Sequence, residues 1–217
     1  KKIIVFSRDE QKQYEAANRI NLKKYKNVRF FIGDVRDFER LHRAFANVDY
    51  VIHAAAMKHI TSSEYNPTEC IATNINGAQN LIDASIINEV EKVIALSTDK
   101  AANPVNIMGA SKSLMEKLIL SKKNDFRVST ARFANVAFSN GSLLDGFIQR
   151  LNKRQPLSCP ADVKRFFVTP KQSGQICLLA TFLGETGNIF FPKLDFLKDQ
   201  IYFKEIALDF LKERKKY

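Results

Sequence analysis

The 217-residue sequence has little cysteine, no long hydrophobic run and no low-complexity linker, and each absence excludes a class of protein. Cys70, Cys159 and Cys177 are widely spaced and lack the ligand spacing of zinc sites, which favours free thiols in a reducing compartment. No apolar run approaches the roughly 20 residues that a membrane helix needs, and no secretory signal pattern opens the sequence. We therefore expect a globular, cytoplasmic protein without a metal site or a membrane span.

The net charge of +11 does not by itself indicate nucleic-acid binding. Apart from the closing "LKERKKY", the basic residues are scattered and are not interleaved with aromatic residues on one face, as nucleic-acid recognition requires. We expect no nucleic-acid partner. A basic cleft would instead suit anionic ligands such as nucleotides.

Short apolar runs alternate with amphipathic helical stretches along the chain. The pattern predicts strands at 2–6, 28–32, 50–53, 92–96 and 128–133, and helices at 9–24, 37–45, 67–88 and 106–121. Such alternation indicates βαβ units and a doubly wound parallel sheet of the Rossmann type. We expect a dinucleotide-binding domain at 1–135 and a smaller, interleaved α/β substrate lobe at 136–217, where the pattern loosens.

Several motifs follow the predicted strands, where a dinucleotide would bind. Ser7 and Arg8 would face the adenosine ribose and favour NADP over NAD, although "SRDE" also fits a capping box formed by Ser7 and Glu10. After the next strand, Asp34 would bond the adenine amino group and the Val35 backbone would frame the ring. The alternative for this second motif is a helix cap at Asp37.

The third strand ends in "VIHAAAMKH", whose three small residues permit close approach of a cofactor backbone. Ala54, Ala55 and Ala56 are the candidate contacts, and Lys58 would meet a phosphate or a sugar. His53 and His59 are expected to pack or to support other residues, because their surroundings lack the pattern of metal ligands. Asn74 would pin the neighbouring loop or contact the cofactor.

The segment "STDKAANPVNIMGASK" places a hydroxyl, an acid and a base in succession at the end of the fourth strand. Thr98, Asp99 and Lys100 could form an active site, or equally an ordinary helix cap with a solvated ion pair. The active-site interpretation gains weight from Lys112 on the following helix. Ser97, just before this triplet, is a candidate cofactor contact.

These motifs, in this order and together with "ARFANV", resemble those of the nucleotide-activated N-acetylglucosamine 4,6-dehydratases, which are extended short-chain dehydrogenases/reductases. The resemblance implies tightly bound, recycled NADP or NAD and a nucleotide-sugar substrate linked to UDP or GDP. It implies that Asp99 and Lys100 are the acid/base pair, that Thr98 and Asn135 contact the sugar, and that Lys112 binds the nicotinamide ribose. It further implies a homo-oligomer. Within the family, the sequence resembles enzymes of nonulosonic (legionaminic) acid biosynthesis.

The sequence departs from this family at two places. The glycine-rich phosphate loop and the strand before it are absent, so two interior strands are expected to have unpaired edges. Met108 occupies the position of the usual tyrosine, which within the family indicates the configuration-retaining branch rather than a dead enzyme. The alternatives are a sugar-nucleotide epimerase or reductase of the same superfamily, and a non-catalytic nucleotide-binding relative.

Overall fold

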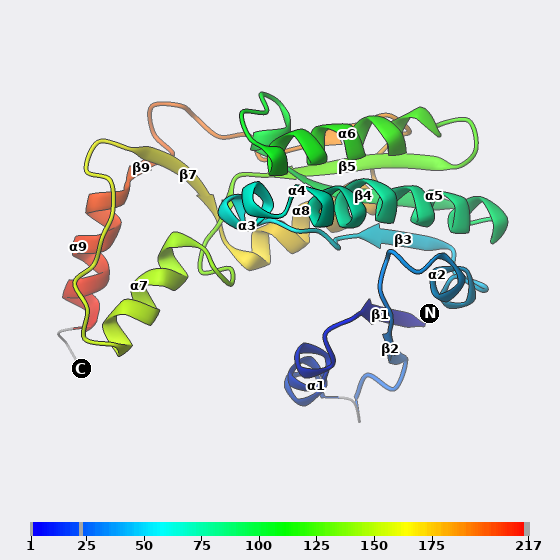
Figure 1. The fold of residues 1–217 in the computed structure, drawn as a ribbon, viewed down its shortest axis with the longest axis horizontal. Helices are drawn as coiled ribbons and strands as arrows, with labels where there is room; N and C mark the ends of the chain where they lie inside the picture. Colours follow the sequence, from blue (N-terminus) through cyan, green and yellow to red (C-terminus); the bar gives the residue numbers. More distant parts are fainter. Residues whose placement is uncertain (1, 22–23, 215–217) are drawn as a thin grey trace.

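The computed structural model describes residues 2–21 and 24–214, which form α/β layers around parallel strands. The largest sheet has four parallel strands in the order β3-β4-β5-β8 (Figure 1). These strands are β3 (Tyr50–His53), β4 (Lys92–Thr98), β5 (Arg127–Phe133) and β8 (Ile189–Phe190). Their β-branched and aromatic composition predicted β3 with its observed bounds and the other long strands to within two residues. The doubly wound α/β fold is confirmed.

Helices cover both faces of this sheet because alternate strand residues point to opposite sides. Val93 and Ala95 of β4 join one core cluster with Met115 of α6 (Ile107–Ser121) and Leu81 of α5 (Gly77–Ile87). Ile94, between them, packs on the opposite face with Ala180 of α8 (Pro170–Phe182). The carboxyl end of β4 therefore emerges between two helical layers.

A second sheet consists of β1 (Ile3–Ser7) and β2 (Val28–Ile32), which pair in parallel. Among the described strands, β1 pairs with β2 alone and β3 with β4 alone. A cavity of about 160 Å³ lies between the two sheets and is lined by apolar residues of both, including Phe6 and Val51. The unpaired edges lie where the sequence predicts them.

Helix α1 (Glu10–Arg19) corrects the expected capping box. The N-cap is Asp9, whose carboxylate accepts a hydrogen bond from Lys12 N at 2.9 Å, while the Ser7 hydroxyl accepts one from Asp9 N. A carboxylate two residues closer to the helix takes over the capping role because Asp is as strong an N-cap as Ser. The helix also ends at Arg19, five residues before the predicted end at Lys24. The expected cap by Asp37 on α2 (Phe38–Ala44) is confirmed.

The helical stretch after β3 is α3 (Ile60–Tyr65), α4 (Pro67–Ile71), a π-helical turn over Ala72–Asn76, and α5. The sequence predicts one continuous helix over 67–88 and gives no sign of the π turn. Its wider i→i+5 geometry appears in the hydrogen bond from Gly77 N to Ala72 O. Such turns are rare and frequently mark functional sites.

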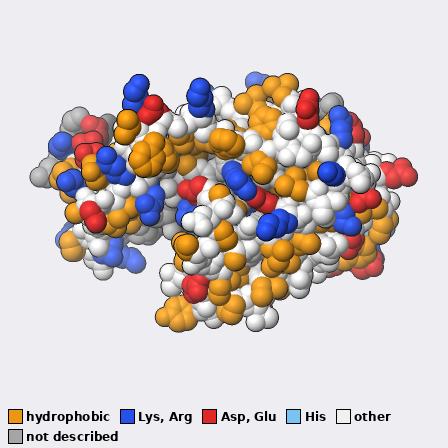
Figure 2. Space-filling view, turned by 90° about the horizontal axis from the view of Figure 1, so that it is seen from above, with side chains coloured by type: hydrophobic (Ala, Val, Ile, Leu, Met, Phe, Trp, Pro, Cys, Tyr) orange, Lys and Arg blue, Asp and Glu red, His pale blue; other side chains and the backbone are white. Residues whose placement is uncertain are grey.

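The remaining elements form a three-stranded sheet with two helices. The strands β6 (Asn135–Val136), β7 (Lys164–Val168) and β9 (Gln200–Tyr202) pair in the order β6-β7-β9, with β7 and β9 antiparallel. Helices α7 (Leu143–Asn152) and α9 (Phe203–Arg214) pack together through Phe147 and Phe210 and hang to one side of the main sheet (Figure 1). Lysine and arginine side chains are scattered over the visible face of the molecule (Figure 2).

Candidate active site

One pocket of about 400 Å³ collects seven of the predicted cofactor residues. It opens where β1, β2 and β3 end, and small side chains leave room there for a ligand backbone. Its lining includes the predicted Ser7, Arg8, Asp34, Val35, Ala54, Ala55 and Ala56, together with Phe6, Asp9, Lys12, Gly33 and Thr73. The volume and the small residues fit the adenosine part of a dinucleotide.

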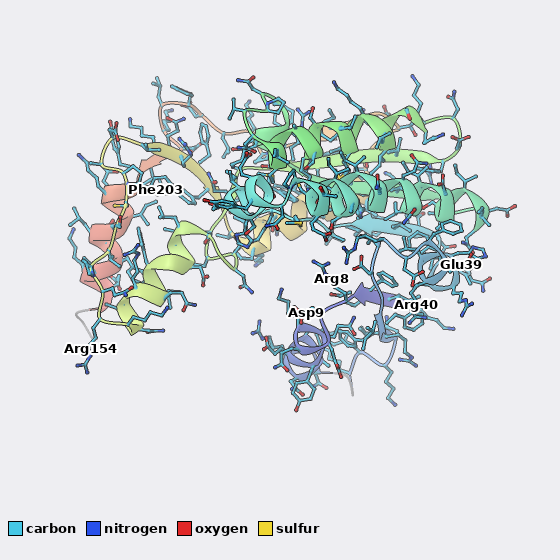
Figure 3. All side chains as sticks on the ribbon, in the orientation of Figure 1. Arg8, Asp9, Glu39, Arg40, Arg154 and Phe203 are labelled. Atoms are coloured by element: carbon cyan, nitrogen blue, oxygen red, sulfur yellow. The ribbon has the colours of Figure 1, made fainter. Side chains whose placement is uncertain are left out.

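Lys12 is a pocket residue that sequence reasoning missed. It lies in the first turn of α1, and a cation at the start of the helix that follows the first strand was the available signal. Arg8 and Asp9 lie where β1 gives way to α1 (Figure 3). The Arg8 side chain is 58% exposed and makes a long contact of 3.5 Å with the Asp34 carboxylate. Two cations, one of them weakly paired, therefore border the pocket.

The carboxylate of Asp34 is held mainly by Arg36. Arg36 Nη2 donates to Asp34 Oδ2 at 2.8 Å, and the Arg36 backbone N–H donates to Oδ1 at 3.0 Å. These bonds hold the pKa of Asp34 below its usual range. The carboxylate thus stays ionised at the pocket wall, where its remaining lone pairs can accept a hydrogen bond.

Asn74 does not line the pocket but fixes the loop that does. Its side chain is fully buried in the π turn, and its Oδ1 accepts from Met57 N while its Nδ2 donates to Met57 O and to Ser111 Oγ. Since Thr73 lines the pocket, the π turn presents one residue to the ligand space and the next to the loop. Of its two predicted roles, the structure supports loop pinning.

Lys58 extends beyond the small residues of this loop, near charges from two other elements. Burial lowers the pKa of Lys58, the Lys12 ammonium lowers it further, and Asp145 at the start of α7 raises it. Lys58 therefore lies between this pocket and the start of α7. This location suits contact with a phosphate or a sugar.

The predicted catalytic triplet forms a connected cluster at the carboxyl end of β4. Thr98 Oγ1 donates to Asp99 Oδ1 at 2.8 Å, and Lys100 Nζ donates to the same oxygen at 3.0 Å. Lys100 Nζ also lies 3.5 Å from Asn135 Oδ1, so the predicted substrate residue joins the cluster from β6. Asp99 remains about half exposed. The Thr98 hydroxyl and the Lys100 ammonium thus meet at one oxygen of the accessible Asp99 carboxylate.

Helix α6 begins directly against this cluster. Asn106 caps the helix by accepting from Gly109 N at 2.8 Å. A Cβ atom at Gly109 would lie 2.8 Å from the Lys100 carbonyl oxygen, so only glycine allows this approach. Met108, in the same turn, is 5% exposed. Met108 thus occupies a buried position in the turn of α6 that follows the triplet, and its thioether cannot transfer a proton.

Lys112 of α6 and Ser97 of β4 are buried and do not line the pocket. Lys112 is 6% exposed, and its Nζ donates to Leu96 O at 2.9 Å. Burial lowers the pKa of Lys112 to about 8. Within the described residues, the buried hydroxyl of Ser97 has no hydrogen-bond partner. The expected ribose contact by Lys112 stays a prediction.

Neither metal ligands nor a membrane span are found in the described part of the chain. Across residues 2–21 and 24–214, no three His, Cys, Asp or Glu side chains gather as metal ligands would. No helix in those ranges combines the length and the apolar character needed to cross a bilayer.

Comparison with protein families matches residues 1–207 to a family described as "Polysaccharide biosynthesis protein". A Campylobacter jejuni (strain 81-176) protein named UDP-N-acetylglucosamine 4,6-dehydratase (inverting) is 45% identical over 205 residues, covering 91% of this chain and 60% of the relative. A Rickettsia canadensis protein named UDP-glucose 4-epimerase is 42% identical over 199 residues, covering 89% of this chain and 58% of the relative.

Solved structures agree on the fold. The X-ray structure of Pen from Bacillus thuringiensis matches with a TM-score of 0.92 at 33% identity, covering 100% of this chain and 67% of that one. DesIV, a dTDP-glucose 4,6-dehydratase from Streptomyces venezuelae with NAD and TYD bound, matches with a TM-score of 0.82 at 20% identity, covering 97% of this chain and 71% of that one. The chain spans about 60% of the length of the curated relatives cited above. It belongs to the polysaccharide biosynthesis protein family and has the fold of the extended short-chain dehydrogenases/reductases.

Proposed function

We propose that the protein removes water from a nucleotide-linked N-acetylglucosamine, UDP- or GDP-linked, to give the 4-keto-6-deoxy sugar nucleotide. The observation that carries this proposal is the cluster of Thr98, Lys100 and Asn135 around the accessible carboxylate of Asp99. It lies at the carboxyl end of β4, where ligands of parallel sheets bind. The Campylobacter relative, named as a dehydratase of UDP-N-acetylglucosamine, supports the UDP-linked substrate.

The neighbouring pocket fits a nicotinamide dinucleotide, which when bound supplies reversible hydride acceptance. Ser7 and Arg8 at the pocket wall favour NADP, and Lys12 adds a second cation near the same site. Ala54, Ala55 and Ala56 would frame the dinucleotide backbone. Lys112 would hold the nicotinamide ribose, with Ser97 beside it.

In the proposed reaction, the residues of the cluster move two protons. Asp99, supported by Thr98, accepts the proton of the sugar 4-hydroxyl as C4 is oxidised. The resulting ketone acidifies the C5 proton, which Lys100 accepts in its neutral form. Asp99 then returns its proton to the departing C6 hydroxyl, which leaves as water. Lys100 finally returns its proton to C5 when hydride has reached C6, so the net change is loss of one water.

This scheme predicts retention of configuration at C5. Lys100 removes and returns the C5 proton from one face of the ring, while the thioether of Met108 cannot deliver a proton from another. The Campylobacter relative bears "inverting" in its name, so stereochemistry is a separate part of the proposal. The C5 configuration of the product, determined by NMR coupling constants, decides it, and an inverted centre would refute the single-base scheme.

The test of the reaction itself is mass spectrometry of the full-length protein incubated with UDP- and GDP-N-acetylglucosamine. Dehydration lowers the substrate mass by one water, about 18 Da. A second candidate, 4-epimerisation, is favoured by the Rickettsia relative's name and would leave the mass unchanged while altering the chromatographic mobility of the sugar. Unchanged mass and mobility with both substrates would favour a non-catalytic nucleotide-binding protein. A homo-oligomer in the cytoplasm stays a prediction.

A further inference from the structure

Helix α6 carries a buried acid one turn beyond its buried lysine. Lys112 and Glu116 are 6% and 3% exposed, and their i, i+4 spacing places them on the same face of the helix. The Lys112 ammonium donates to Leu96 O at 2.9 Å and contacts Met115 Sδ at 3.5 Å. Both acceptors are uncharged, so its buried positive charge must be stabilised by charges that lie farther away.

Arg132 of β5 fixes the Glu116 carboxylate in one orientation. Arg132 Nε donates to Oε1 at 2.9 Å, and Nη2 donates to Oε2 at 2.6 Å. Bidentate pairs of this kind are strong and directional. Residue Asn135 of the catalytic cluster follows Arg132 by three positions, so the pair also ties α6 to the strand that leads into the cluster.

The titratable and charged groups around Lys112 come from four elements. They are His53 on β3, Cys70 on α4, Glu116 on α6 itself, and Arg132 on β5 as the partner of Glu116. Burial lowers the pKa of Lys112 to about 8, while Glu116, and to a smaller extent Cys70, oppose this shift. Glu116 is therefore the main described group that favours the charged lysine.

We propose that Glu116 is a positioning residue: held by Arg132, its carboxylate keeps the buried Lys112 ammonium protonated beside the carboxyl end of β4. The catalytic consequence rests on the proposed function, because Lys112 would act there on the cofactor ribose. The charge coupling between Glu116 and Lys112 is a property of this chain and can be measured without any substrate.

The experiment is a pH titration by NMR of the full-length protein labelled with ¹³C at the lysine Cε atoms. The Lys112 signal is assigned by its absence from Lys112→Met, and its midpoint is expected near pH 8. Glu116→Gln should lower that midpoint by about one pH unit, because removing a nearby negative charge favours the neutral amine. Glu116→Asp keeps the charge and should leave the midpoint nearer to the wild-type value, and it remains available if the glutamine variant does not fold.

The matched control is Glu91→Gln. Glu91, just before β4, pairs with Arg127 at the start of β5, the opposite end of that strand from Arg132. Its loss should not move the Lys112 midpoint. An unchanged midpoint in Glu116→Gln, or an equal shift in Glu91→Gln, would overturn the proposal.

A second measurement follows the pH profile of kcat/KM for water loss. The alkaline limb in Glu116→Gln should move downward with the NMR midpoint, whereas a purely structural role would lower activity at all pH values alike. A shifted midpoint with an unshifted alkaline limb would refute the catalytic part of the proposal. If the wild type removes no water, the proposed function fails, and the NMR titration still decides the charge coupling.

Discussion

The side chain of Asn74 holds the backbone of Met57 on both sides, accepting from its N–H at 2.7 Å and donating to its carbonyl at 3.0 Å. A second donor bond of 2.8 Å reaches Ser111 on α6. One buried amide therefore joins the loop that follows β3, the π turn and the helix that carries Met108 and Lys112. The loop is fixed by a residue 17 positions away, not by its own composition.

Replacing Asn74 by Ala should loosen this loop. Loss of the side-chain hydrogen bonds of this buried residue, with the Met57 groups left unpaired, should cost about 2–4 kcal/mol of unfolding free energy. NADP affinity should also fall, because the alanine-rich loop is no longer held. Urea unfolding and fluorescence titration measure the two effects. Asn66→Ala, which removes one exposed side-chain bond, should change both far less, and equal effects at the two positions would contradict the pinning role.

Asp99→Asn should stop the oxidation of the sugar at C4. The amide cannot accept the 4-hydroxyl proton, so we expect a rate loss of roughly 10²–10⁴-fold. Rapid-mixing absorbance should then show no transient reduced cofactor. If reduced cofactor accumulates as in the wild type, another group accepts that proton.

Arg8→Ala should lower the affinity for NADP and affect the affinity for NAD only slightly. Arg8 borders the pocket and is weakly paired, so its guanidinium is free to meet a 2′-phosphate. Loss of a charge-assisted hydrogen bond predicts a decrease of about 10- to 100-fold. Calorimetric titration with both dinucleotides measures the ratio. Arg19→Ala, at the far end of α1, is the control; an unchanged NADP/NAD ratio in Arg8→Ala would contradict the assignment.

His53 should make the fold sensitive to acid. It is 1% exposed, neither ring nitrogen has a hydrogen-bond partner within the described ranges, and burial followed by the Lys112 charge lowers its pKa to about 3. Between pH 6.5 and 3, His53 is protonated in the unfolded chain but stays neutral in the folded chain, so stability falls as the pH falls. The loss approaches 4–5 kcal/mol, on the order of 1.4 kcal/mol per pH unit.

Urea unfolding of His53→Phe across this pH range tests the assignment. The variant lacks the titrating group, so its stability should fall less steeply on acidification than that of the wild type. If the unfolding free energies of the two proteins fall equally steeply on acidification, another group governs the loss of stability.

Lys92 is the main buried cation that the sequence left unnoticed. Its ammonium donates to the carbonyls of Ala180, Thr181 and Gly184 and so closes the carboxyl end of α8. Lys92→Met should cost roughly 3 kcal/mol of unfolding free energy, because three buried carbonyls lose a charged donor. Lys123→Met, at an exposed position, should stay within about 0.5 kcal/mol of the wild type in the same urea experiment.

The parts predictable from sequence were those governed by local pattern. The β-branched runs at 28–32 and 50–53 were predicted with the bounds of β2 and β3, and the caps at Asp37 and Asn106 lie at the expected helix starts. Pocket residues from three motifs were predicted together because ligands bind outside the carboxyl ends of parallel strands.

The parts that could not be predicted depend on partners distant in sequence. The residues next to Lys92 do not indicate that its ammonium binds a carbonyl 88 positions away. Those next to Glu116 do not indicate that it pairs with an arginine 16 positions away. The cap of α1 was assigned to Ser7 because both Ser7 and Asp9 suit that role, and only the path of the chain chooses between them. The π turn could not be predicted either, because its Asn74 is held by Met57 in the loop after β3 and by Ser111 on α6.

That π turn also sets the phase of the whole helical stretch from Pro67 to Ile87. An i→i+5 turn accommodates one residue more than an α-helical turn, so the segments before and after it present their faces as if that residue had been inserted between them. Deleting a single residue within Ala72–Asn76 would let the stretch relax into an ordinary helix that keeps both buried faces. The amide that holds Met57 would then be rotated away. Function at this position thus depends on a change of helical phase and not only on the identity of a side chain.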